Sequence, residues 1–124
     1  MQLFLLLVSL LALSPNIVHA QDAGDYRSVA TGNWENINTW ETFDGTLWVA
    51  AATAPSSSDG VITIRNPHTV SITQAITIDQ VVVNAAAALH AFNAVVTIAD
   101  GPGNDVVQNG TMFIASSGTL NVAA

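Results

Sequence analysis

The chain contains no cysteine and no lysine, and its only basic residues are Arg27 and Arg65. The absence of cysteine excludes disulfide bonds and thiolate metal sites. Nucleic acids and anionic membrane surfaces attract clusters of lysine and arginine, so two arginines beside nine acidic residues argue against both partners. Only 9% of the residues are charged and 50% are hydrophobic, which is too apolar for a disordered chain. This composition is typical of one small, exported, β-rich domain.

Long hydrophobic runs are also scarce, because only residues 3–13 form one, and that run is too short to span a membrane comfortably. Ser14-Pro15-Asn16 then ends any helix, and Val18-His19-Ala20 places small residues at the two positions that signal peptidase reads. We therefore predict a secretory signal peptide over residues 1–20, although its start lacks a basic residue. The mature protein is expected to be secreted or on the cell surface, with no membrane span; an uncleaved anchor is the alternative.

Short β-type runs recur throughout the second half of the chain and are separated by turn residues. Apolar and small polar residues alternate in most of these runs, which is the pattern of a strand with one buried face. The expected strands cover residues 61–64, 70–72, 76–78, 81–83, 95–98, 112–114 and 120–122. The sequence therefore predicts an all-β fold.

The same region repeats itself. Residues 82–99 shifted forward by 24 positions fall on residues 106–123 without a gap, and the apolar positions coincide. A repeat of this length, filled with short strands, indicates a β-solenoid whose coils stack about 4.8 Å apart. We predict a right-handed parallel β-helix over residues 61–124, with an ordinary β-sandwich as the alternative. We expect this β-helix to continue in a longer natural chain or its end to pair with another chain.

Residues 21–60 differ in composition, because five of the eight aromatic residues fall between Tyr26 and Trp48. Asp44-Gly45 between two β-type runs predicts a hairpin with a two-residue turn. An open end of stacked β-coils must be covered, so we expect these aromatic side chains to form an N-terminal cap. The alternative is that Trp34, Trp40 and Trp48 are exposed and stack on sugar rings.

The loop that follows the strand expected at 95–98 is the one candidate metal site. Residues 100–107 resemble a calcium-binding nonapeptide, Gly-Gly-x-Gly-x-Asp-x-apolar-x, with Asp100 in the first glycine position. Asp100, Asn104 and Asp105 would supply side-chain oxygens, which calcium prefers. The chain has one copy of this motif and no tandem repeat of it, so a plain turn is the alternative and no other cofactor is expected.

Several segments together resemble the start of large secreted or surface β-helix proteins of Bacteroidetes-type bacteria. They cover residues 26–34, 38–41 and 55–72, and they are also similar to the eight-glycine domain of extracellular β-helix proteins. The resemblance implies a β-helix fold and an extracellular location. It implies as partners downstream domains of the same protein or an extracellular polysaccharide.

No catalytic residues are predicted, since the nine acidic residues show no catalytic spacing and neither His68 nor His90 accompanies a nucleophile motif. The favoured function is a non-catalytic structural or adhesive module of an exported β-helix protein. A carbohydrate-binding module that uses an exposed tryptophan is one alternative. The non-catalytic start of a polysaccharide-degrading enzyme is another.

Overall fold

A computed structural model describes residues 20–123 of the chain. The expected signal peptide, residues 1–20, lies outside the described residues except for Ala20. Within residues 20–123, no helix has the length and the apolar character needed to cross a membrane.

The described chain consists of short strands and one 3₁₀ turn, η1 (Ile37–Thr39). The strands before and around η1 are β1 (Tyr26–Ser28), β2 (Gly32–Asn33), β3 (Trp40–Phe43) and β4 (Trp48–Ala50). The remaining strands are β5 (Ile62–Ile64), β6 (Thr69–Ile72), β7 (Ile76–Ile78), β8 (Val81–Val83), β9 (Ala88–Ala91), β10 (Val95–Ile98), β11 (Val106–Gln108), β12 (Thr111–Ile114) and β13 (Thr119–Val122). The expectation of an all-β chain is confirmed.

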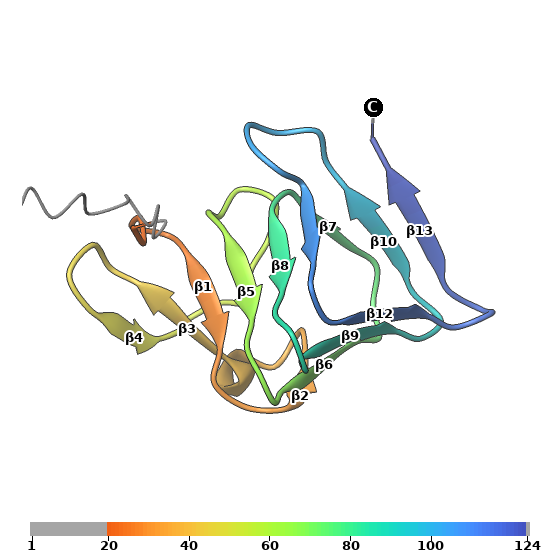
Figure 1. Cartoon of the computed structure of the whole chain (residues 1–124), viewed down its shortest axis with the longest axis horizontal. Helices are drawn as coiled ribbons and strands as arrows, with labels where there is room; N and C mark the ends of the chain where they lie inside the picture. The colour runs from red at the N-terminus through yellow and green to blue at the C-terminus, as the bar shows by residue number, and fades with distance from the viewer. Residues whose placement is uncertain (1–19, 124) are drawn as a thin grey trace, which may run out of the picture.

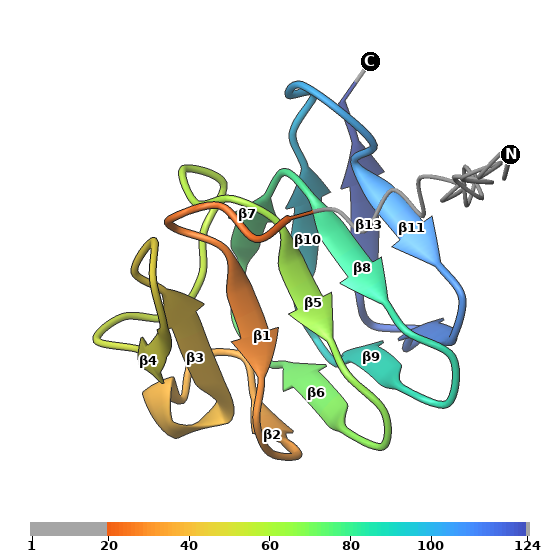
Figure 2. The same ribbon diagram turned by 60° about the vertical axis from the view of Figure 1, so that its left-hand side comes forward.

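Three sheets contain these strands, and the chain visits the sheets in turn (Figures 1 and 2). The six-stranded sheet has the order β11-β8-β5-β1-β3-β4, the four-stranded sheet β12-β9-β6-β2, and the three-stranded sheet β13-β10-β7. Successive passes run β5-β6-β7, β8-β9-β10 and β11-β12-β13, and every pairing between passes is parallel. We call these passes coils 1, 2 and 3. The three sheets do not close on one another, and the right-handed β-helix stays a prediction.

The interior between the sheets is filled by alternate side chains of each strand. In β8 of coil 2, Val81 and Val83 are buried while Val82 between them faces outward, and in β10 Val96 and Ile98 are buried while Thr97 faces outward. This alternation arises because successive side chains of a strand point to opposite faces of the sheet. The period-2 pattern of the sequence is therefore the direct cause of the common apolar interior.

Residues 21–60 extend two of the sheets as well as covering one end of the interior. β1 pairs with β5 in parallel, and β2 pairs with β6 in parallel. β1 also pairs antiparallel with β3, which in turn pairs antiparallel with β4. The sheets thus run without interruption across the boundary predicted at residue 60, and the aromatic segment begins as a partial coil.

The predicted hairpin is present, but its turn is longer than expected. Phe43 pairs with Trp48, which leaves residues 44–47 in the turn instead of two residues. Asp44 stabilises the longer turn, because its Oδ1 accepts hydrogen bonds from the amides of Thr46 and Leu47, both at 2.8 Å. These two hydrogen bonds also lower the pKa of the exposed Asp44 carboxyl.

The predicted repeat register is correct for one sheet and wrong for the other two. β10 and β13 pair with the expected offset, so that Val96 meets Leu120. Val82, however, pairs with Val107 instead of Val106, and Leu89 pairs with Met112 instead of Phe113. The cause is turn length, since residues 84–87 separate β8 from β9 while only 109–110 separate β11 from β12. A one-residue slip exchanges inward and outward faces, so the ungapped alignment misplaced both strands.

Candidate functional site

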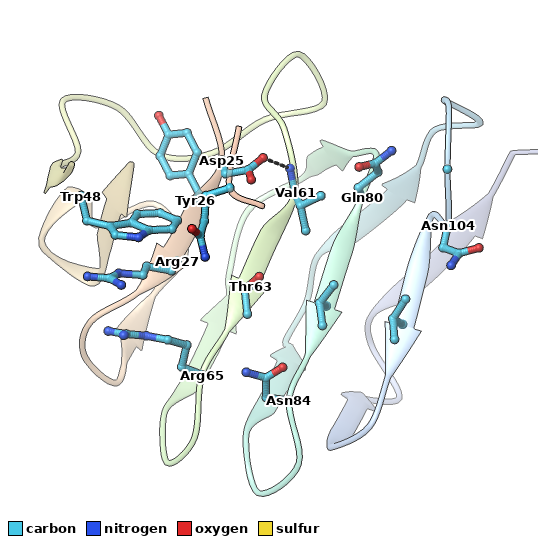
Figure 3. Close-up of a pocket in the computed structure, with 14 residues that line it drawn as sticks. Asp25, Tyr26, Arg27, Trp48, Val61, Thr63, Arg65, Gln80, Asn84 and Asn104 are labelled. Carbon is cyan, nitrogen blue, oxygen red and sulfur yellow. Dashed lines mark hydrogen bonds between the residues drawn. The ribbon is translucent and has the colours of Figure 1, made fainter. Parts of the chain in front are cut away.

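A groove of about 650 Å³ lies on the outer face of the six-stranded sheet (Figure 3). Outward side chains of neighbouring strands form its floor, because the parallel register aligns Thr63, Val82 and Val107 in one row. Arg27 continues this row on β1, where it pairs with Thr63. Polar side chains flank the row, among them Gln80, Asn84, Asn104 and Arg65, and Trp48 stands at one end.

Both arginines of the protein line this groove. Arg27 donates two hydrogen bonds to Oε2 of Glu41, from Nε at 2.9 Å and from Nη2 at 2.7 Å. Its guanidinium carbon also lies 4.3 Å from the centre of the Trp48 ring, which is a cation–π contact. Arg65 donates from Nε to the carbonyl oxygen of Ser28 at 2.8 Å. Two guanidinium groups therefore share one end of the groove.

The positive charge at this end is not fully balanced. In residues 20–123 the structure shows one salt bridge, between Arg27 and Glu41, so Arg65 has no carboxylate partner there. Burial and then the nearby charge of Arg27 lower the pKa of Arg65, while Glu41 opposes this effect. Arg65 still carries its full charge at neutral pH, since an arginine does not lose its proton in proteins. A second anion at this end of the groove would relieve the repulsion between the two cations.

The three tryptophans proposed as sugar platforms have different surroundings. Trp34 and Trp40 are each 1% exposed and pack edge to face, with ring centres 4.9 Å apart. Their indole nitrogens donate to the carbonyl oxygens of Pro55 and Trp34, at 3.0 and 2.8 Å. Buried rings with satisfied nitrogens have no face open to a ligand, so this pair acts as part of the core. Trp48 is partly exposed and is the one candidate platform of the three.

The residues of the predicted calcium loop are placed on the rim of coil 3. Asp100 and Asn104 are exposed, whereas Asp105 is half-buried. Among residues 20–123, no three His, Cys, Asp or Glu side chains are grouped closely enough to hold a metal ion. A plain turn accounts for what the structure shows, and a calcium site on Asp100, Asn104 and Asp105 stays a prediction.

Two buried carboxylate oxygens have no hydrogen-bond partner here, Oδ1 of Asp105 within this loop and Oδ1 of Asp79 beside it. Gly101 packs directly against the carboxylate of Asp79, so that a side chain at position 101 would overlap it. Buried polar atoms normally find a partner, which makes these two oxygens an exception that needs an explanation.

A serine and a histidine lie together at the turn between β5 and β6. Oγ of Ser28 is 2.8 Å from Nδ1 of His68, and it also accepts a hydrogen bond from the amide of Arg65 at 2.9 Å. Ser28 is completely buried, so no substrate reaches its oxygen. The pair fixes the turn and is not a nucleophile with its base. Burial and then the charge of Arg65 lower the pKa of His68.

Sequence reasoning missed both the groove and an exposed aromatic cluster on the four-stranded sheet. In that cluster, His90, Phe92 and Phe113 approach one another with ring centres 5.6 to 6.2 Å apart. Phe92 and Phe113 are 39% and 48% exposed. The planes of the three rings are steeply inclined to one another, so they do not form a flat stacking surface. One sequence signal could have indicated the groove: Arg27, Thr63 and Val82 are each the outward residue in a strand whose inward and outward residues alternate.

Comparison of the chain with protein-family models, with curated proteins and with solved structures finds no match. Two surfaces of the described chain are candidates for a function. One is the groove, and the other is the open edge of coil 3, formed by β11, β12 and β13, each the last strand of its sheet.

Proposed function

We propose that this chain is a non-catalytic structural module that begins a right-handed β-helix in an exported, cell-surface protein. Its task is to start the parallel stack and to carry further coils on the open edge of coil 3. The observation that supports this proposal most strongly is that the inward positions of coil 3 are only half-buried or exposed, although the paired positions of coil 2 are buried.

The contrast between coils is clear in the three-stranded sheet, where residues are directly paired. Val96 is 2% exposed and its partner Leu120 is 38% exposed. Ile98 is completely buried and its partner Val122 is 62% exposed. These residues have the same register and similar chemistry, so the difference comes from the coil that covers one member of each pair. A further coil would remove Leu120 and Val122 from water, with a gain of roughly 25 cal/mol for each Å² buried.

The backbone of coil 3 also favours a further coil as the structure that covers its edge. β11, β12 and β13 are each the last strand of their sheet, so each presents an edge without a second partner in the described chain. Such edges bind another strand readily, and proteins normally cover or protect them. A parallel coil with the same alternation would pair with all three edges at once, as coil 2 does with coil 1.

Export is the second part of the proposal, and it is supported by the signal-peptide pattern of residues 1–20 and by the scarcity of charge. The first test is the intact mass of the native protein from the extracytoplasmic fraction of its source cells. We expect removal of residues 1–20 and a mass well above that of residues 21–124. Recovery of an unprocessed chain from the cytoplasm would refute export.

The second test concerns the open edge, with purified residues 21–124 as the starting material. A copy of coil 2, residues 79–99, is fused after residue 123. The control fusion carries aspartate at the inward positions equivalent to Val96 and Ile98. Adjacent coils stabilise one another, so we expect the first fusion to melt at a higher temperature than the unfused chain and the control to show no gain. Equal melting temperatures for both fusions would contradict the stacking role.

A further inference from the structure

We propose that the groove on the six-stranded sheet binds a carboxylate-bearing sugar chain, with Arg65 and Arg27 holding the carboxylate. This is a ligand site in addition to the structural role, and it does not depend on it. Four features of the groove carry the inference.

The first feature is charge. The protein has a formal net charge of −7 and two basic residues, and both line the same groove. Only Glu41 neutralises them among the described residues, through its salt bridge to Arg27. A guanidinium presents several N–H donors in a plane and suits a carboxylate better than a point charge does. The Nε of Arg65 is engaged by Ser28, and its terminal nitrogens have no hydrogen-bond partner in the described chain.

The second feature is fixed orientation. Arg27 is held between the carboxylate of Glu41 and the ring of Trp48, and Arg65 is anchored to the backbone of Ser28. Side chains that are already ordered lose little conformational entropy on binding, which favours affinity. In Figure 3 the two guanidinium groups point the same way from adjacent strands, toward the end of the groove where Trp48 lies.

The third feature is the polar lining farther along the sheet. Gln80, Asn84 and Asn104 place amide groups beside the floor of the groove. An amide offers both donors and acceptors, as a sugar hydroxyl does, so the two groups pair readily. Thr63 adds a hydroxyl to the floor.

The fourth feature is shape, because the groove crosses the strands from β1 to β11 and is open to solvent along the sheet. An open groove of this kind accommodates an extended chain and does not enclose a small compact ligand. The floor side chains Val82 and Val107 offer a shallow apolar surface for the faces of sugar rings.

Trp48 supplies the reporter for the test. Trp34 and Trp40 are each 1% exposed, whereas Trp48 lines the groove. A ligand that changes tryptophan fluorescence therefore acts on Trp48. Titration of residues 21–124 with tetragalacturonate, followed by fluorescence and by calorimetry, is expected to give saturable binding. Its methyl ester, which lacks the negative charges, is expected to bind at least about tenfold more weakly, since hydrogen bonds to charged groups contribute about this factor.

Three variants separate this site from a general effect on folding, with melting temperature measured for each. Arg65→Gln is expected to lower affinity for the acid about tenfold or more and to leave the ester unchanged. Glu41→Gln is expected to raise affinity for the acid, because it leaves Arg27 without a competing carboxylate. Thr77→Ala on the exposed side of β7 is the control and should bind as the unchanged protein does. A gain of affinity in Glu41→Gln cannot come from damage to the fold.

Several outcomes would overturn the proposal. One is the absence of saturable binding of tetragalacturonate at millimolar concentration. Another is equal affinity for the acid and its ester, and a third is weaker binding of the acid by Glu41→Gln. Hexaglutamate serves as a peptide of comparable charge. If it binds as tightly as the sugar acid, the site recognises carboxylates in general and the assignment to a sugar chain is wrong.

Discussion

Two identical substitutions, Val83→Ala and Val122→Ala, test whether the interior of the stack ends at coil 3. Each valine is the last residue of its strand and faces the interior, Val83 in β8 and Val122 in β13. Val83 is completely buried and Val122 is 62% exposed. The residue type and the place in the strand match, so the two sites differ in burial and in the position of the strand, since β8 is central in its sheet and β13 lies at an edge.

The expected magnitudes follow from the area that each side chain removes from water. Valine to alanine deletes two carbon groups, which corresponds to about 1.6 kcal/mol of transfer free energy when both are buried. The cavity left at Val83 adds to this, for a total loss of about 2–3 kcal/mol. At Val122 the exposed fraction scales the transfer energy down to about 0.6 kcal/mol, and no closed cavity forms. For a domain of this size, the first loss lowers the melting temperature by about 10 °C or more, and the second by less than about 5 °C.

The assay is urea unfolding of residues 21–124 followed by circular dichroism, at two protein concentrations. Losses of equal size at both sites would refute the reasoning, because they would mean that Val122 is as well covered as Val83. Comparing the loss at Val122 at the two protein concentrations then shows why Val122 is covered. If the cost at Val122 falls on dilution, a second copy of the chain covers the edge, and if it does not, the inward assignment of Val122 is wrong.

Three further predictions concern contacts between coils. Gly110→Ala should lower the free energy of unfolding by about 2 kcal/mol or more in urea, because a Cβ at position 110 would overlap the carbonyl oxygens of Asn84 and Ala87 in coil 2. The comparison is Gly45→Ala in the exposed hairpin turn. There the cost arises from the φ of +103° alone, and we expect a loss of about 1 kcal/mol. Asp25→Ala should cost about 2–4 kcal/mol, since it removes the acceptor of the amides of Asp22 and Val61, and Asp25→Asn should cost less because one acceptor oxygen remains. His68 has a lowered pKa, so the unfolded chain binds its proton first, and stability should fall as the pH is lowered through 6.5 toward the folded pKa. His68→Asn should flatten this decline in stability below about pH 6.5; a profile of His68→Asn that matches the unchanged protein would exclude His68 as the cause.

The parts of this fold that could be predicted are those encoded in neighbouring residues. Alternation in 62–64, 76–78 and 95–98 shows which side chains face inward, because the direction of a side chain depends only on its place in the strand. Strand β9 was missed because Ala88–Ala91 carries alanines and a histidine in place of β-branched residues. Its pairing with β6 and β12 holds it as a strand regardless of propensity.

The candidate site could not be predicted because it depends on which strands become neighbours. Arg27 and Arg65 are far apart in the chain and meet only because β1 and β5 pair in parallel. Burial of tryptophan is equally non-local, since Trp34 and Trp48 both follow turn residues in the sequence and differ in what packs over them. The register between coils 2 and 3 is non-local as well, because it depends on the lengths of the turns between strands.

The corners of the coils, more than the interior, specify how these coils stack. Val, Ile and Leu replace one another inside the stack, and such exchanges are tolerated when volume is conserved, so the interior alone discriminates poorly between registers. Two corners are specific. Gly60 lies against the carboxylate of Asp25, and Gly101 lies against the carboxylate of Asp79, with no room for a side chain at either glycine. Shifting a strand by one residue would place a Cβ on a carboxylate and would separate Asp25 from the amide of Val61. These contacts penalise the register errors that the apolar interior would permit.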